Sequence, residues 1–171
     1  MSRFQIRLVL LFASLSLIIA NRLSALESDK DQQVVWSSDG DSTMSIMGNS
    51  RILEMNTNVI VTQGTLEIRG NQATFEYRIS NNELTKVTVH GTPVRYTQQL
   101  YENGDSVTGA SNTLLFYTNE LNETVLELLG NANIESPDST ISCSTIIYIA
   151  DKDLIREAVG PCRGSLNAQQ N

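Results

Sequence analysis

From Leu26 onward the chain alternates apolar and polar residues with a period of two, in short segments separated by Asn, Gly, Asp and Ser clusters about every ten residues. The alternation is clearest at 58–62 and 86–90, and such strands bury one face only. Helical periodicity is nearly absent, so one helical turn near 26–32 is the most that we expect. The sequence therefore predicts an all-β fold with turns between short strands.

A weak internal repeat adds a bend to each strand. Gly70, Gly109 and Cys143 align when the chain is shifted along itself by 39 and 34 residues, and each follows an Ile or Val two positions earlier. The apolar parity flips near each small residue, as a β-bulge causes where a strand turns a corner. We predict three copies of a bent strand pair stacked in one antiparallel architecture.

Bent strands with one apolar face fold over each other, either into two packed sheets or into a trough with an apolar inner face. The predicted inner residues are Val34, Trp36, Val59, Val61, Ile68, Phe75, Val87, Val89, Tyr96, Val107, Leu114, Phe116, Leu126, Leu128, Ile134, Ile141, Ile146 and Tyr148. Taken alone, the alternation favours a filled core over a binding groove, because most apolar faces in proteins are core.

The first 25 residues have the layout of a secretory signal peptide: Arg3 and Arg7, an apolar run over 8–20, and the small residue Ala25. The run is shorter than the roughly 20 residues of a membrane-spanning helix. Cleavage after Ala20 and a retained anchor are the alternatives. We expect an exported domain over 26–164 and a flexible polar tail over 165–171.

Charge and composition exclude several classes of function. The chain has 12 basic and 19 acidic residues; removing 1–25, with its three arginines, leaves nine against nineteen, which argues against nucleic-acid binding. An enzyme would have to use Cys143 with His90, yet a lone histidine beside a Gly-Thr-Pro turn is usually a solvated loop residue. The segment Asp39-Gly-Asp-Ser lacks the further oxygen ligands of a calcium loop. We predict no enzyme, metal or cofactor.

The segment Asn58-Val-Ile-Val-Thr-Gln-Gly-Thr-Leu-Glu-Ile resembles the family of the periplasmic lipopolysaccharide (LPS) transport protein LptA and its OstA-like relatives. The segment Asp31-Gln-Gln-Val-Val-Trp-Ser-Ser-Asp is similar to the first strand of that family. Further matches follow in the family order: Gly91-Thr-Pro, Tyr96, Gly104, Val107-Thr-Gly-Ala-Ser, Leu129-Gly-Asn-Ala, Asp138-Ser and Tyr148. The resemblance covers about 31–163.

This resemblance implies an open antiparallel β-jellyroll, folded like a taco, that carries LPS from the inner to the outer membrane by cradling the lipid A acyl chains. The positions where the family contacts lipid correspond to Val34, Trp36, Tyr96 and Phe116. It therefore favours a groove over a filled core. The lipid-binding residues that we expect are the inner residues without Val87, Leu126 and Ile146.

The same resemblance implies partners at both edges of the sheet, joined by strand addition. An inner-membrane LptC-like jellyroll would pair with one edge, and an outer-membrane LptD-like translocon with the strand around 154–163. The edge residues are Val34, Val35 and Trp36 at one end and Leu154, Ile155 and Arg156 at the other. Head-to-tail pairing does not close, so copies would self-associate at high concentration. The alternatives are a membrane-tethered LptC-like jellyroll and a periplasmic β-sandwich with a filled core and no lipid cargo.

The two cysteines depart from the family pattern. If Lys152–Asp153 is a two-residue hairpin loop, facing residues have numbers that add to 305, as 143 and 162 do. Facing residues lie about 4.5–5.5 Å apart between Cα atoms, within the range of a disulfide, and the periplasm is oxidising. The sequence indicates a Cys143–Cys162 disulfide, unless a bulge at Gly160-Pro161 spoils the register and leaves two unrelated thiols.

Overall fold

The computed structural model describes Asp29 and residues 31–100 and 104–167, which form one antiparallel sheet of ten strands. The strands are β1 (Val35–Ser37), β2 (Ser42–Met47), β3 (Ser50–Gln63), β4 (Leu66–Arg78), β5 (Leu84–Gln99), β6 (Ser106–Thr118), β7 (Thr124–Ser136), β8 (Ser139–Ile149), β9 (Leu154–Val159) and β10 (Arg163–Leu166), with one 3-10 turn, η1 (Ala150–Lys152). The predicted all-β class is confirmed. In this part of the chain no helix is long and apolar enough to cross a membrane. The predicted signal peptide, with both cleavage points and the anchor alternative, lies outside the described residues.

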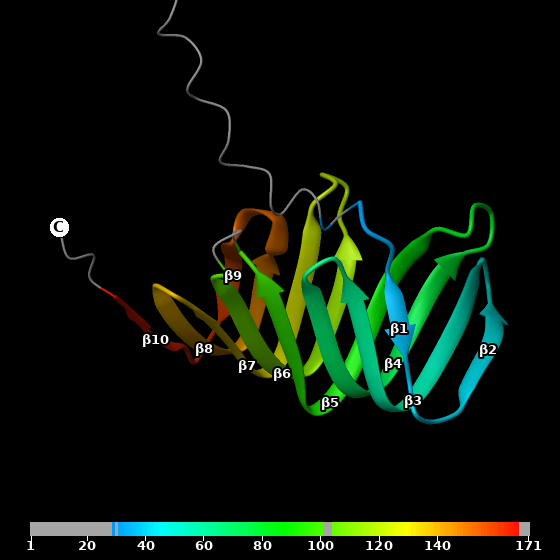
Figure 1. Cartoon of the computed structure of the whole chain (residues 1–171), viewed down its shortest axis with the longest axis horizontal. Coiled ribbons are helices and arrows are strands. Elements are labelled where there is room, and N and C mark those ends of the chain that lie inside the picture. Colours follow the sequence, from blue (N-terminus) through cyan, green and yellow to red (C-terminus); the bar gives the residue numbers. More distant parts are fainter. Residues whose placement is uncertain (1–28, 30, 101–103, 168–171) are drawn as a thin grey trace, which may run out of the picture.

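The strand order is β1-β3-β4-β5-β6-β7-β8-β10, with β2 also paired to β3 and β9 also paired to β8. Each strand pair from β3–β4 to β7–β8 has a register shift near its middle, and Figure 1 shows the long strands bending there. The shifts follow Asn56, Arg69, His90, Ala110 and Leu129. The bulges predicted near Gly70 and Gly109 are thereby confirmed.

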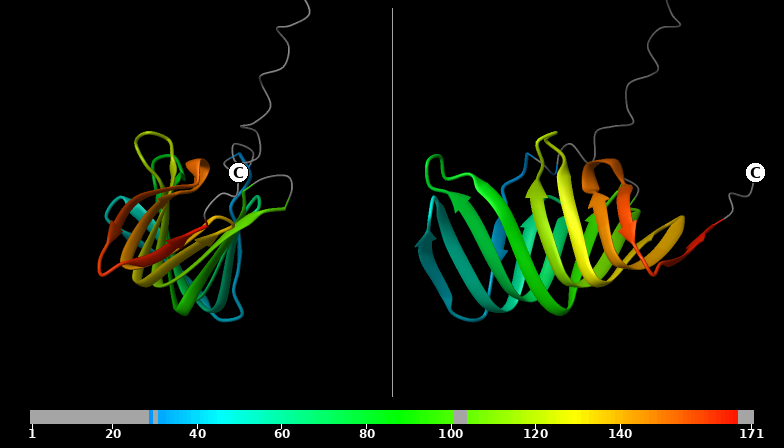
Figure 2. Two further views of the ribbon diagram at one scale, coloured as in Figure 1. Left: turned by 90° about the vertical axis from the view of Figure 1, so that its left-hand side faces the viewer. Right: turned by 180° about the vertical axis from the view of Figure 1, so that it is seen from behind.

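This row of bulges, the corner line, divides the sheet into two layers. The first layer holds β1, β10 and the strand halves that end at turns 64–65 and 137–138 and at Leu100 and Asp105, and these ends form the first rim. The second layer holds β2, β9 and the halves that meet at turns 79–83, 119–123 and 150–153, which form the second rim. Figure 2 shows the two layers meeting at the corner and diverging toward the turns. We call the line between the rims the mouth.

The apolar core lies between the layers. Fifteen of the eighteen predicted inner residues are buried, while Val34 and Ile141 are partly buried against the core and Trp36 is 40% exposed. Alternation placed them correctly because the bulge at the corner keeps the apolar side inward in both layers. Each fully buried Val, Leu, Ile or Phe contributes about 1.5–3 kcal/mol relative to its exposed state, so this face holds the fold together.

The β8–β9 connection differs from the expected two-residue loop. Ile149 pairs with Leu154, so the loop has four residues, 150–153, and facing numbers add to 303. A register shift after Ile147 raises that sum to 304, and beyond Gly160-Pro161 it reaches 305, as in the pair Arg163 and Ser142. The single edge strand expected over 154–163 is therefore two strands, β9 and β10.

The polar tail begins later than predicted. Ser165 and Leu166 belong to β10, where they pair with Thr140 and Ser139 of β8. The Asn167 backbone N–H donates to the Asp138 carbonyl oxygen at 2.9 Å. The ordered chain thus extends beyond residue 164, because the edge of β8 offers these residues backbone hydrogen bonds. Residues 168–171 lie outside the described part.

Candidate functional site: an apolar trough with a polar bridge

The apolar trough is the candidate site, and two cavities lie along its mouth. The first cavity, about 300 Å³, lies between Val34 and Gln63 on the first-layer side and Leu84 and Phe116 of the second layer. Val34, Leu84 and Phe116 give it an apolar wall, and Lys86 and Asp31 add charges. The structure brings together here two residues predicted to bind lipid, Val34 and Phe116.

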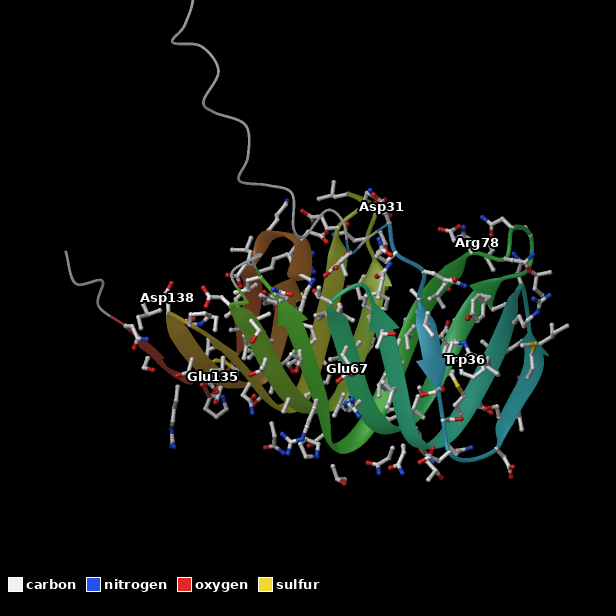
Figure 3. The ribbon with its side chains drawn as sticks, in the orientation of Figure 1. Asp31, Trp36, Glu67, Arg78, Glu135 and Asp138 are labelled. Atoms are coloured by element: carbon white, nitrogen blue, oxygen red, sulfur yellow. A yellow bond between two sulfur atoms is a disulfide. The ribbon has the colours of Figure 1, made fainter. Side chains whose placement is uncertain are left out.

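The second cavity, about 420 Å³, lies toward the other end of the mouth. Leu100 and Ile134 of the first layer face Tyr148 and Ile155 from the second. Acidic side chains stand around it, and Asp138 is one of them. Figure 3 shows Asp31 of the first cavity and Asp138 of the second on the turn side of the molecule, well apart along its length. The cavities therefore lie on the mouth side of the packed core.

A chain of polar contacts, the polar bridge, crosses the trough. Its members are Asp29, Thr65, Gln98, Tyr96, Tyr148 and Asp153. At the first rim the Asp29 carboxylate accepts the Thr65 backbone N–H at 3.0 Å, the Thr65 hydroxyl at 2.6 Å and the Gln98 amide at 3.1 Å. The Tyr96 hydroxyl donates to Gln98 Oε1 at 2.7 Å.

The bridge reaches the second layer through two tyrosines. The Tyr96 and Tyr148 ring centroids are 6.2 Å apart, and the Tyr148 hydroxyl donates to Asp153 Oδ1 at 2.8 Å. Burial, with the negative charge of Asp153, raises the pKa of Tyr96 well above its ordinary value. Burial is also the main cause that raises the pKa of Tyr148. Both hydroxyls therefore stay protonated in neutral solution and can donate.

Apolar side chains continue onto the exposed ends of the inner face. At one end Trp36 lies with its ring centroid 6.3 Å from that of Phe75, and Met44, opposite buried Leu53, is 60% exposed. At the other end Leu166 pairs with Ser139 and lines the second cavity, yet it is 84% exposed. The inner surface is therefore apolar from the core to both outer strands.

The two edges of the sheet are each split between two short strands. In the described part, β1 and β2 pair only with β3, and β9 and β10 pair only with β8. Of the predicted edge residues, Val35 and Trp36 lie in β1, with Val34 just before it, and Leu154, Ile155 and Arg156 lie in β9. Val35 and Arg156 are exposed, so the edges are accessible.

The structure joins Cys143 and Cys162 in a disulfide. Cys143 is in β8, and Cys162 lies between β9 and β10. The Cys143 sulfur, which an enzyme would need as a nucleophile, is therefore part of the disulfide. His90 Nδ1 lies 3.0 Å from the Thr113 hydroxyl, on the exposed side of the sheet. Asp39, from the segment that lacks the ligands of a calcium loop, accepts a hydrogen bond from the Asn58 amide at 2.8 Å.

Sequence reasoning missed four of the six residues of the polar bridge: Asp29, Thr65, Gln98 and Asp153. Gln98 could have been found from the sequence. It lies two residues after Tyr96, so its side chain points to the same inner face, where an amide is unusual. Asp29 carried no such signal, since it precedes the first strand and no pattern places it against Thr65. Met55, Leu66 and Val94 are buried as well and were absent from the predicted inner set.

The comparisons with known proteins agree with this architecture. The model of the family described as "LptA/(LptD N-terminal domain) LPS transport protein" matches residues 38–153. The lipopolysaccharide export system protein LptA of Haemophilus influenzae is 30% identical over 149 residues, which is 86% of this chain and 82% of that protein. LptA of Escherichia coli K12 is 29% identical over 143 residues, covering 80% of this chain and 74% of that protein.

A solved structure shows the same fold. It is the crystal structure of LptH, the LptA homologous periplasmic component of the lipopolysaccharide transport device of Pseudomonas aeruginosa, with a TM-score of 0.66 and 16% identity. The match covers 82% of this chain and 99% of that one. The predicted open β-jellyroll is thereby confirmed, and the relatives' names describe non-enzymatic transport proteins, as expected for a chain that is not an enzyme. By the extent of the family match and by its relatives, this chain belongs to the LptA/LptD N-terminal domain family of LPS transport proteins.

Proposed function

We propose that this protein carries LPS through the periplasm, holding the lipid A acyl chains in its apolar trough and linking partners through its two sheet edges. The observation that carries the proposal is the inner face, which is apolar from the core to the outer strands at both ends. The names of the curated relatives, LPS export system proteins, give the cargo class. The disulfide fits an oxidising compartment such as the periplasm.

The acyl chains would enter from the mouth. Val34 and Phe116 wall the first cavity, and Ile134 and Tyr148 wall the second. Because each buried CH₂ contributes about 0.8 kcal/mol, an apolar slot can hold acyl chains with no catalytic group. The inner side chains around Leu114 and Leu128 pack against one another, so deeper entry would require the two layers to separate.

The edges would join the protein to its partners by strand addition, which supplies main-chain hydrogen bonds and aligns adjoining troughs. An LptC-like jellyroll would pair with β1 at Val34–Trp36, and an LptD-like translocon with β9 at Leu154–Arg156. Unpaired edges otherwise promote aggregation, so a partner also explains why they are left open. Copies of the chain could stack head to tail in the same way.

Site-specific photocrosslinking in cells tests the cargo. A photoreactive residue at Phe116 and at Tyr96 should form adducts with LPS, whereas one at Thr88, on the outward face of β5, should not. An exported, folded protein that gives no LPS adduct at either inner position would return the trough to the alternative of a filled β-sandwich core. That alternative draws support from the complete burial of residues such as Leu114 and Leu128.

A further inference from the structure

The polar bridge lies where the trough must open if cargo is to enter. Val59, Val107 and Leu128 are completely buried, so the layers pack together without a passage at their level. Along the mouth, the bridge begins beside Asp31 and Gln63, which line the first cavity, and ends at Tyr148 and Asp153, which line the second. The bridge therefore separates the two cavities.

The Asp29 end of the bridge is held more firmly than its position in the chain suggests. Asp29 stands six residues before β1, yet it is only 6% exposed. Its carboxylate accepts three hydrogen bonds, two from Thr65 on the first rim and one from Gln98 near the end of β5. A Cβ atom added to Gly64 would lie 2.1 Å from Asp29 Oδ1, so the aspartate rests directly on the β3–β4 turn.

The contacts of the bridge are of a kind that can open without unfolding the sheet. They are hydrogen bonds that involve side chains and one tyrosine pair, whereas at the corner line the two layers are joined covalently by the long strands that run through it. Asp29 and Tyr148 are 6% and 1% exposed, so water can replace their hydrogen bonds only once the rims have parted; the net free-energy cost of each exchange is then modest. Apolar packing at Leu128 offers no such exchange.

We propose that the polar bridge is a latch that closes the mouth in the cargo-free protein, and that Asp29 must leave Thr65 and Gln98 before acyl chains can pass between the two cavities. This inference rests on the proposed function. In the closed state the tyrosine pair joins the two layers, and Asp29 supports it from the first layer by holding Gln98, the acceptor of the Tyr96 hydroxyl. In the open state the rims separate.

The variants Asp29→Asn, Tyr96→Phe and Tyr148→Phe each remove a charge or a hydroxyl and keep the shape of the side chain. The matched controls are Asp41→Asn, which removes an exposed charge beside the corner line, and Thr113→Val, which removes the hydroxyl 3.0 Å from His90 Nδ1 on the exposed side; neither residue lines the two cavities. Spin labels at Leu121→Cys on the second rim and Asp138→Cys on the first rim report the opening without any cargo.

The latch predicts that the three bridge variants shift the label pair to longer distances and load LPS several-fold faster, while both controls match the native protein. An engineered Asp29→Cys/Thr65→Cys disulfide should slow loading, and reductant should restore it; the native protein given the same reductant controls for loss of Cys143–Cys162.

Unchanged distances and unchanged loading in all bridge variants would overturn the latch. Longer distances in a protein that takes up no LPS in any form would overturn the proposed function and leave the latch standing.

Discussion

Cys143 and Cys162 form a disulfide that ties β8 to the corner between β9 and β10, so a single covalent bond holds both strands of the C-terminal edge. The two residues are 19 positions apart in the chain. Under the proposed function this edge is the surface that a partner strand must find, and the bond keeps its two short pieces on β8.

Replacing both cysteines by serine should lower the free energy of unfolding by about 3 kcal/mol, because the unfolded chain regains the freedom of a closed loop of this length. Urea denaturation of the oxidised native protein and of the Cys143→Ser/Cys162→Ser variant measures the difference. Reduced native protein should resemble the variant. An unchanged denaturation midpoint would mean that the edge is held without the bond.

Leu128→Ala should lower the free energy of unfolding by about 2–5 kcal/mol, because Leu128 is completely buried between the layers and its loss leaves a cavity. Leu121→Ala is the matched control, since Leu121 is 76% exposed and surface changes usually stay within about 0.5 kcal/mol. Chemical denaturation of both variants gives the comparison. Equal, small losses would show that the inner face is a loose groove wall and not a packed core.

Charges at the open end of the trough should weaken self-association. Met44 and Ile46 lie on the inner face of β2 and are 60% and 72% exposed, whereas Thr43 and Ser45 point to the other face of the same strand. Met44→Lys/Ile46→Lys should therefore reduce head-to-tail oligomers in sedimentation velocity at high concentration. Thr43→Lys/Ser45→Lys adds the same charge and should leave them in place. Equal effects of the two pairs would point to charge repulsion instead of an apolar contact.

The second rim should give the protein part of its acid sensitivity. Hydrogen bonds from Lys152 and then Asn119 lower the pKa of Glu123 below its ordinary value. A carboxylate with a lowered pKa stabilises the fold fully above its unfolded-state pKa and loses that effect as the pH falls through the lowered value. Glu123→Gln should thus be less stable than the native protein at pH 7 and lose less on acidification.

Thermal denaturation of Glu123→Gln between pH 7 and pH 3 measures this dependence. Glu120→Gln, at an exposed position of the same turn, removes an equal charge and should follow the native curve. If both variants follow the native curve, the Lys152 contact contributes nothing to the pH profile.

Much of the fold followed from alternation, because a half-buried strand must turn every second side chain toward the core. Phe75, Leu114 and Tyr148 are buried for that reason, and the parity flip beside Gly70 correctly marked the bend. The β8–β9 loop could not be predicted, since its register depends on a bulge after Ile147 and on the corner at Gly160-Pro161. These two irregularities offset the wrong loop length, so the cysteines face each other all the same.

The polar bridge could not be predicted from the sequence for a different reason. Its contacts join residues far apart in sequence, such as Asp29 to Gln98 and Tyr96 to Tyr148, and no local period encodes such pairs. A polar residue at an inward parity position, like Gln98, marks only that some partner must exist. Which partner it has depends on how the two layers are set against each other.

The corner line also affects how the sequence can change over evolution. Because each long strand crosses a bulge, as between Asn56 and Val59, the side-chain alternation on one side of the bend is not locked to that on the other. An insertion or deletion of one residue at the bend changes the size of the bulge there. The alternation of inward and outward side chains in either layer then stays the same. Relatives can thus drift in strand length at these positions and still keep an apolar lining from end to end.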